Sequence, residues 1–171
     1  MQTTRVAVVP YNPEWKSDFE KIKAELEAAL SDLIVGIEHV GSTSVEGLSA
    51  KPCIDIDVIM KDYSVFDDVV QKLAKLGYVH EGNLGIKDRE AFKYEDKPHL
   101  RTHHLYVCPQ NSRELYRHIT FRDFLRGNPR AVKKYSAVKE RAAELYPDDI
   151  SKYMEYKSAC IEELYHLCGL H

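Results

Sequence analysis

Residues 53–60 constrain the fold more than any other stretch, because apolar and acidic side chains alternate along them. The apolar positions are Ile54, Ile56 and Val58, and the acidic positions are Asp55 and Asp57. Successive side chains of a strand point to opposite faces of the sheet. The alternation therefore predicts a β-strand with one face on a core and two carboxylates on the other. Their Cα atoms should lie about 6.5–7 Å apart, so both carboxylates can reach one cation.

Hydrophobic periodicity predicts the elements on either side of this strand. A helix is expected to begin at Asn12-Pro13, where Asn can cap and Pro suits the first turn. Its predicted buried stripe is Trp15, Phe19, Ile22, Leu26, Ala29 and Leu33. We also expect a strand over Ile34 to Val40 and a second helix over Asp62 to Leu76, ended by Gly77.

The second half of the chain changes from short strands to helices. The runs 78–80, 91–94 and 103–107 are expected to be antiparallel-type strands of the same sheet, because Gly, Asp and Pro separate them. Three helices are expected to follow, with starts at Ser112, Asn128-Pro129 and Asp148-Asp149 and the last ending near Leu167. The order predicts an α/β (α+β) fold, in which flanking helices and a C-terminal helical cap surround a mixed sheet.

Length and composition limit what kind of protein this is. The 171 residues fit a single domain, 1–171, with a core over about 1–110 and the cap over about 111–171. We expect reduced, buried thiols at Cys53, Cys108, Cys160 and Cys168, because no CxxC pair occurs. Met1 to Val9 lacks a signal-peptide core and no apolar run reaches roughly 20 residues, which predicts a cytoplasmic protein without a membrane span.

Charge is distributed unevenly along the chain. The net charge of −3 argues against a partner that is a long nucleic acid. From Arg113 to Arg141, however, nine Lys/Arg stand against three Asp/Glu, an excess of six positive charges that leaves −9 for the remainder. This pattern suits a ligand that carries phosphates and arrives with a metal, or else a solvated helical face. The sequence leaves both interpretations open.

The turn after the first predicted strand is the second chemical feature. Gly41 lets the backbone approach a phosphate, and Ser42, Thr43 and Ser44 add hydroxyl and amide donors. An ordinary turn that leads into a capped helical turn would have the same residues. Likewise, Asp55 and Asp57 suit magnesium, which takes one or two protein carboxylates with phosphates and water, but they also suit a solvent-exposed strand face.

Taken together, the two segments form a more specific pattern than either alone. An apolar residue and Gly41-Ser42 are followed, after twelve residues, by Asp55-Ile56-Asp57. This spacing resembles the signature of the DNA polymerase beta-like nucleotidyltransferase superfamily. The longer string His39-Val40-Gly41-Ser42-Thr43-Ser44-Val45, Gly47-Leu48, Ala50-Lys51-Pro52 and Ile54-Asp55-Ile56 resembles the GrpB family, a branch of that superfamily. Matches extend along nearly the whole chain, from Val9-Pro10-Tyr11 to Tyr146-Pro147-Asp148-Asp149.

The resemblance implies roles for particular residues. It implies that Gly41 and Ser42 contact a triphosphate and that Asp55 and Asp57 hold Mg²⁺ (or Mn²⁺). Active members of the superfamily commonly carry a third carboxylate on a later strand, but no acid occurs in residues 101–107. His104 is the candidate there, as a metal ligand or a base, and it would shift the preference towards manganese or zinc. A packed core histidine is the alternative.

Three cations complete the predicted site. Lys51, Arg101 and Arg122 could neutralise phosphates, or they could be ordinary surface charges. The leading functional hypothesis is a metal-dependent nucleotidyltransferase with an unknown acceptor. The main alternative is a non-catalytic module that binds a nucleotide or another phosphorylated small molecule. A link to coenzyme A metabolism would fit it, since GrpB-like domains occur fused to dephospho-CoA kinases. Phosphate-ester hydrolysis, with water as acceptor, is the third hypothesis.

Overall fold

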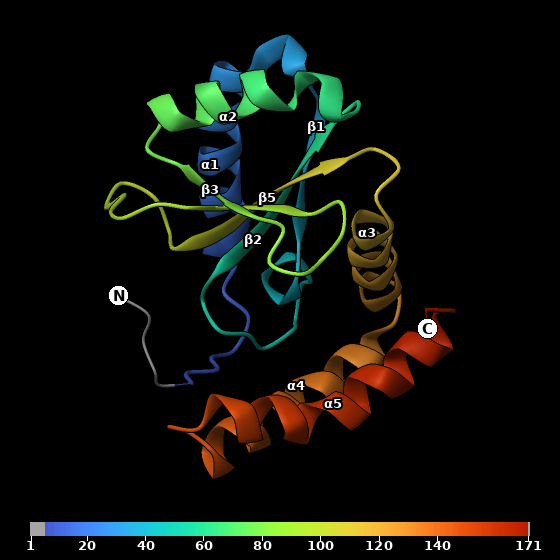
Figure 1. Cartoon of the computed structure of the whole chain (residues 1–171). Coiled ribbons are helices and arrows are strands. Elements are labelled where there is room, and N and C mark those ends of the chain that lie inside the picture. Colours follow the sequence, from blue (N-terminus) through green and yellow to red (C-terminus); the bar gives the residue numbers. More distant parts are fainter. Residues whose placement is uncertain (1–5, 171) are drawn as a thin grey trace.

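The computed structural model describes residues 6–170 (Figure 1). Residues 1–5 and 171 lie outside the described residues. They are the two ends of the predicted domain, and residues 1–5 also belong to the stretch Met1 to Val9 that was expected to lack a signal peptide. Among residues 6–170, no helix has the length and apolar character needed to cross a membrane. Of the four free thiols, Cys108 and Cys160 are buried as expected, whereas Cys53 and Cys168 are only half-buried.

Five strands form one mixed sheet in the order β1-β2-β5-β4-β3. The strands are β1 (Ile34–Val40), β2 (Ile54–Met60), β3 (Val79–Gly82), β4 (Glu90–Lys93) and β5 (His103–Pro109). β2 runs antiparallel to β1 but parallel to β5, and β3 and β4 continue antiparallel from β5. The expectation of antiparallel-type pairing is therefore wrong for β5 against β2. The long connection through a helix and the β3–β4 hairpin is what allows a parallel pair.

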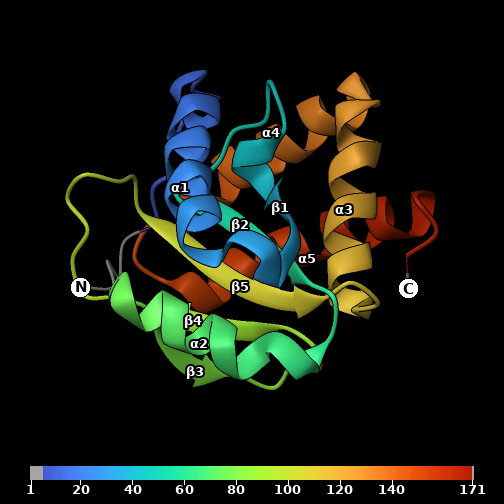
Figure 2. The same ribbon diagram turned by 90° about the horizontal axis from the view of Figure 1, so that it is seen from above.

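Two helices cover one face of this sheet, α1 (Glu14–Leu30) and α2 (Phe66–Lys75) (Figure 2). Trp15, Ile22 and Leu26 of α1 are fully buried against Ile54 and Ile56 of β2. The alternation predicted for β2 is thus confirmed, and its apolar face forms the main core.

Both helices are shorter than the sequence predicts. α1 ends at Leu30, and Ser31, with φ +44°, leads into a 3-10 turn (Ser31–Leu33). The last buried residue of the helix is therefore Leu30 rather than the predicted Ala29, and Leu33 packs on the core from the 3-10 turn instead of from the helix. The second helix was expected to begin at Asp62 but begins at Phe66. A 3-10 turn (Tyr63–Val65) precedes it, because the Asp62 carboxylate accepts a hydrogen bond from the backbone N–H of Ser64 and stabilises that turn.

Three helices form the predicted C-terminal cap: α3 (Arg113–Arg126), α4 (Pro129–Leu145) and α5 (Ile150–Leu167). Ser112, Asn128 and Asp149 accept backbone N–H groups at their starts, so all three predicted start positions are confirmed. Figure 1 shows α4 and α5 side by side beyond one end of the sheet and α3 beside it.

The cap packs on the loop that follows β1. Val45 and Leu48 of that loop belong to a second apolar cluster with Leu125 of α3, Tyr135 of α4 and Leu164 of α5. This packing brings the three cap helices to the Gly41–Ser44 turn. The acidic face of β2 starts beside the same turn.

Candidate functional site

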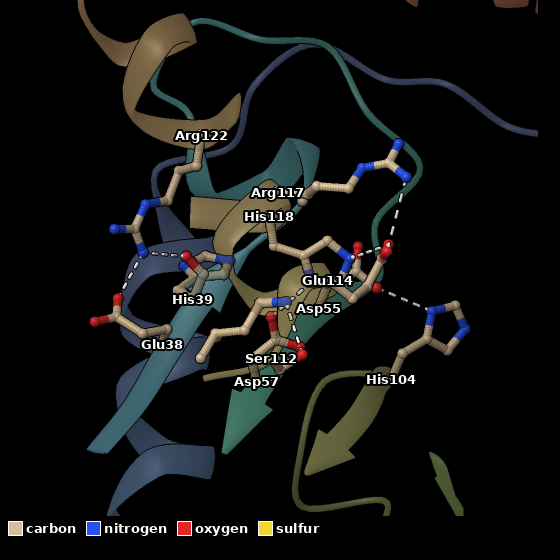
Figure 3. Close-up of polar contacts among 12 residues, drawn as sticks. Glu38, His39, Asp55, Asp57, His104, Ser112, Glu114, Arg117, His118 and Arg122 are labelled. Atoms are coloured by element: carbon tan, nitrogen blue, oxygen red, sulfur yellow. Dashed lines mark hydrogen bonds and ion pairs between the residues drawn. The ribbon is translucent and has the colours of Figure 1, made fainter. Parts of the chain in front are cut away.

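Asp55 and Asp57 leave β2 on the face opposite the main core, and each carboxylate is held by a histidine (Figure 3). Asp55 is partly exposed, and its Oδ1 accepts a hydrogen bond from His104 Nδ1 at 3.0 Å. Asp57 is fully buried, and its Oδ2 accepts one from His118 Nδ1 at 2.6 Å. The sequence also allowed a solvent-exposed strand face at these positions, and that alternative is wrong for Asp57.

His104 and its neighbour His103 point to opposite faces of β5. His104 stands opposite Asp55 in the parallel register, its side chain is 59% exposed, and the hydrogen bond to Asp55 raises its pKa to about 10. His103 is the packed core histidine, with Nε2 at 2.7 Å from the Tyr78 hydroxyl. The structure thus places His104, the sequence's candidate for the third position, beside Asp55.

His118 of α3 was missed by the sequence reasoning. Its Nδ1 faces Asp57, and its Nε2 lies 3.2 Å from Glu114 Oε1 one helical turn earlier. Nδ1 donates to Asp57 and Nε2 faces a second carboxylate, an arrangement that favours the doubly protonated imidazolium form. Burial lowers the pKa of His118, but the hydrogen bond to Asp57 and the charges of Asp57, Glu114 and Asp55 outweigh it and raise that pKa. The Glu114-x-x-x-His118 spacing was the available signal.

Gly41 is required by the turn in which it lies. Its φ is +74°, a conformation that favours glycine, and a Cβ on it would lie 2.2 Å from Asp55 Oδ2. The next hydroxyl, that of Ser42, accepts a hydrogen bond from the Lys139 ammonium of α4. The Gly41-Ser42 backbone and the Asp55 carboxylate are therefore in contact, as their spacing predicts.

The two other hydroxyls of the turn are engaged within it. Thr43 Oγ1 shares a hydrogen bond with His39 Nε2 at 2.9 Å, and Ser44 Oγ donates to Gly41 O at 2.5 Å. Thr43 lines the same cavity as Asp55, whereas Ser44 lines a different one, beside α1. The structure separates Ser44 from the carboxylates.

A cavity of about 220 Å³ opens beside Ser42 and Asp55. We call it the lysine cavity, because its lining includes Lys51, Lys139 and Lys157 as well as His104. Lys139 is only 3% exposed and also donates to Ser49 O at 3.2 Å. Burial, and next the charge of Lys157, lower the pKa of Lys139 to about 7. Lys51 was predicted here, but Lys139 and Lys157 were not.

A second cavity, of about 200 Å³, adjoins Ser42 and Asp55 under the cap. We call it the aromatic cavity, since Phe121, Tyr135 and Tyr165 line it together with His118. Ser42 and Asp55 border both cavities, so any ligand group held at these two residues can extend into either.

The two predicted arginines end up in different places. Arg122 lines the aromatic cavity, and its Nη1 donates to Glu38 Oε2 at 2.6 Å and to His39 O at 3.0 Å. Arg101 pairs with Asp18 at 2.8 Å and with Glu14 at 3.6 Å, both on α1. Arg101 is therefore not brought to the lysine or the aromatic cavity.

One observation supports a divalent cation at the two carboxylates. Asp57 Oδ1 is buried and has no hydrogen-bond partner. Within residues 6–170, no three His, Cys, Asp or Glu side chains are grouped so that they could hold a metal ion by themselves. Mg²⁺ does not need such a group, because it binds one or two carboxylates and takes its other oxygens from phosphates and water.

Comparisons with known proteins show the family of the chain. The family model for the GrpB protein matches residues 5–167. The chain belongs to the GrpB family. The glutamate-rich protein GrpB of Alkalihalophilus pseudofirmus is 35% identical over 164 residues, which cover 93% of each chain. UPF0157 protein YqkA of Bacillus subtilis is 31% identical over 158 residues, but these are 92% of this chain and only 46% of YqkA.

Solved structures place this family among nucleotidyltransferase folds. The conserved protein GrpB from Enterococcus faecalis superposes with a TM-score of 0.82 at 34% identity, covering 95% of this chain and 96% of that one. The Cid1 poly(U) polymerase with MgGTP bound matches with a TM-score of 0.55 at 11% identity, covering 80% of this chain and 44% of Cid1. The second likeness shows the fold alone.

A longer relative carries the name of an enzyme. A dephospho-CoA kinase of Mycolicibacterium paratuberculosis is 26% identical over 183 residues, which cover 94% of this chain and 45% of the kinase. More than half of that kinase therefore lies outside the region of similarity.

Proposed function

We propose that this chain is a metal-dependent nucleotidyltransferase that binds a nucleoside triphosphate at Ser42 and Asp55. The single observation that carries the proposal is the lysine cavity. Three lysines gather there beside the turn and the acidic strand, and one of them, Lys139, is buried at the cost of a lowered pKa. Ionisable groups with strongly shifted pKa values cluster at functional sites, so a buried ammonium beside a cavity is a candidate for binding an anion.

Each group has a part in the proposed reaction. Lys51, Lys139 and Lys157 would neutralise the phosphates that leave as pyrophosphate, and Ser42 would orient them. Asp55 and Asp57 would hold Mg²⁺ or Mn²⁺, which would polarise the phosphoryl oxygens and lower the pKa of the attacking hydroxyl. The rings of the aromatic cavity would stack on the nucleobase.

A second candidate function rests on β5. His104 and Tyr106 stand opposite Asp55 and Asp57, so β5 offers no carboxylate to the site. This favours a non-catalytic module that binds a nucleotide or another phosphorylated ligand. The similarity to a dephospho-CoA kinase suggests coenzyme A precursors as ligands to test. We propose the cytoplasm as its location, where free thiols stay reduced.

Calorimetric titration with ATP, GTP, CTP, UTP and inorganic triphosphate, with and without Mg²⁺ or Mn²⁺, tests the proposal. We expect metal-dependent binding that Asp55→Asn/Asp57→Asn abolishes. The matched control Asp67→Asn/Asp68→Asn removes two exposed carboxylates from α2 and should leave binding unchanged. The difference between a nucleotide and triphosphate alone measures the contribution of the aromatic cavity.

Turnover then separates the candidates. Pyrophosphate release that depends on an added acceptor supports nucleotidyl transfer, and release of phosphate or free nucleotide without an acceptor supports hydrolysis. Metal-dependent binding without either product supports the binding module. If no nucleotide binds in the presence of either metal, the nucleotide-binding functions are refuted.

A further inference from the structure

An acidic side chain of α3, Glu114, is linked to Asp57, whereas β5 places no acid opposite it. On β5, the residues that face the two aspartates are His104 and Tyr106. On α3, Glu114 is linked to Asp57 through the ring of His118. The order Glu114, His118, Asp57 is therefore a continuous chain of two carboxylates with an imidazole between them (Figure 3).

Each link of this chain is short and sheltered. The 2.6 Å bond from His118 Nδ1 occupies Asp57 Oδ2, and the 3.2 Å contact of Nε2 with Glu114 Oε1 favours this orientation of the imidazole. The side chain of Asp57 is wholly buried, that of Glu114 is 19% exposed, and that of His118 is 24% exposed. Asp57 Oδ1 alone has no partner. A carboxylate held by one oxygen in a fixed orientation leaves its other oxygen for a cation.

We propose that His118, backed by Glu114, is the positioning residue that orients Asp57 for a divalent cation. The inference rests on the proposed function, because it needs a cation at Asp55 and Asp57. Partners of this kind behind a metal ligand are typically worth about 10–100-fold in metal affinity. Glu114 reaches the site through His118 and contributes negative charge that β5 does not supply.

A purely structural role makes a different prediction. If His118 only satisfies a buried carboxylate, its loss should lower the melting temperature and leave the metal affinity of the folded protein unchanged. Cation affinity, measured separately from stability, distinguishes the two roles.

The test is calorimetric titration of the full chain with Mn²⁺ alone, together with thermal melting of each variant. We expect His118→Ala to weaken Mn²⁺ binding by about 10–100-fold. His118→Asn places an amide N–H close to where Nδ1 stands and should restore most of the affinity. His99→Ala removes an exposed histidine that contacts Glu25 and should bind like the unaltered protein.

Glu114→Ala covers the case in which His118→Ala does not fold, because it leaves the buried bond to Asp57 in place. It should weaken Mn²⁺ binding by roughly tenfold. Unchanged affinity in a folded His118→Ala or Glu114→Ala variant overturns the inference, and so does equal loss in the Ala and Asn variants of His118. If the unaltered protein does not bind Mn²⁺ at all, the metal site of the proposed function fails, and the inference fails with it.

Discussion

Replacing Lys139 by Met should change how the stability of the protein depends on pH. The Lys139 ammonium is buried beside Ser42 and Ser49, and burial together with the charge of Lys157 lowers its pKa to about 7. The charge of Asp55 acts in the opposite direction but does not reverse the shift. At every pH where Lys139 is protonated in the unfolded chain, burial of this group therefore lowers the free energy of unfolding.

The sign and the size follow from proton linkage. Between the folded pKa near 7 and the unfolded value of about 10.4, the unfolded chain binds more protons, so the free energy of unfolding rises with pH. From pH 7 to pH 9, a shift of this size corresponds to a gain of about 2 kcal/mol. For a chain of this length that is a rise of roughly 4–8 °C in melting temperature.

Urea and thermal unfolding at pH 7, 8 and 9 would measure this gain. The unaltered protein should become more stable over that range, and Lys139→Met should lose about 2 kcal/mol of the increase. Lys133→Met removes an exposed charge from the same helix and should keep the increase. Parallel pH profiles for Lys139→Met and the unaltered protein would refute the argument that the Lys139 ammonium is destabilised by burial.

Three further predictions follow from single residues. Gly41→Ala should lower the free energy of unfolding by about 1–3 kcal/mol, because φ there is +74° and the new Cβ would meet Asp55. Its control, Gly36→Ala, has open space around it and should change the free energy of unfolding, measured by thermal melting, by at most about 1 kcal/mol. Asn128→Ala removes the N-cap of α4 and should lower the free energy of unfolding by about 1 kcal/mol, which urea unfolding would show as a lower midpoint. Pyrophosphate binding at pH 7.5 should take up a proton, because an anion raises the pKa of Lys139. Calorimetry in buffers of different ionisation enthalpy measures that uptake, which Lys139→Met should reduce and to which Lys157 of the same cavity can still contribute.

Local patterns were sufficient to predict most of the fold. The strand β2, the stripe of α1 and the caps at Ser112, Asn128 and Asp149 depend on residues a few positions apart, which a single sequence displays directly. The parallel pairing of β2 with β5 was not predictable in this way, because it depends on a connection of more than forty residues.

The candidate site was predictable only in its strand and turn residues. Gly41, Ser42 and Asp55 are close in sequence and form one recognisable spacing, whereas His118 and Lys139 come from helices that pack on them across the fold. In the sequence, both lie within the basic stretch from Arg113 to Arg141, where their neighbours are mostly paired or exposed charges. Apart from the spacing of Glu114 and His118, nothing in that pattern distinguishes an inward lysine or histidine from an outward one.

The buried lysine also explains why the cap belongs to the site rather than merely to the fold. The carboxylates come from the sheet, but Lys139 and Lys157 come from α4 and α5, so the lysine cavity exists only when the cap is packed on the Gly41–Ser44 turn. That packing buries the Lys139 ammonium, and the charge of Lys157 opposes it further, which makes the packed arrangement less stable at neutral pH. An anionic ligand removes this penalty by pairing with both lysines. An anion that binds both lysines in this packed arrangement should therefore stabilise the folded protein.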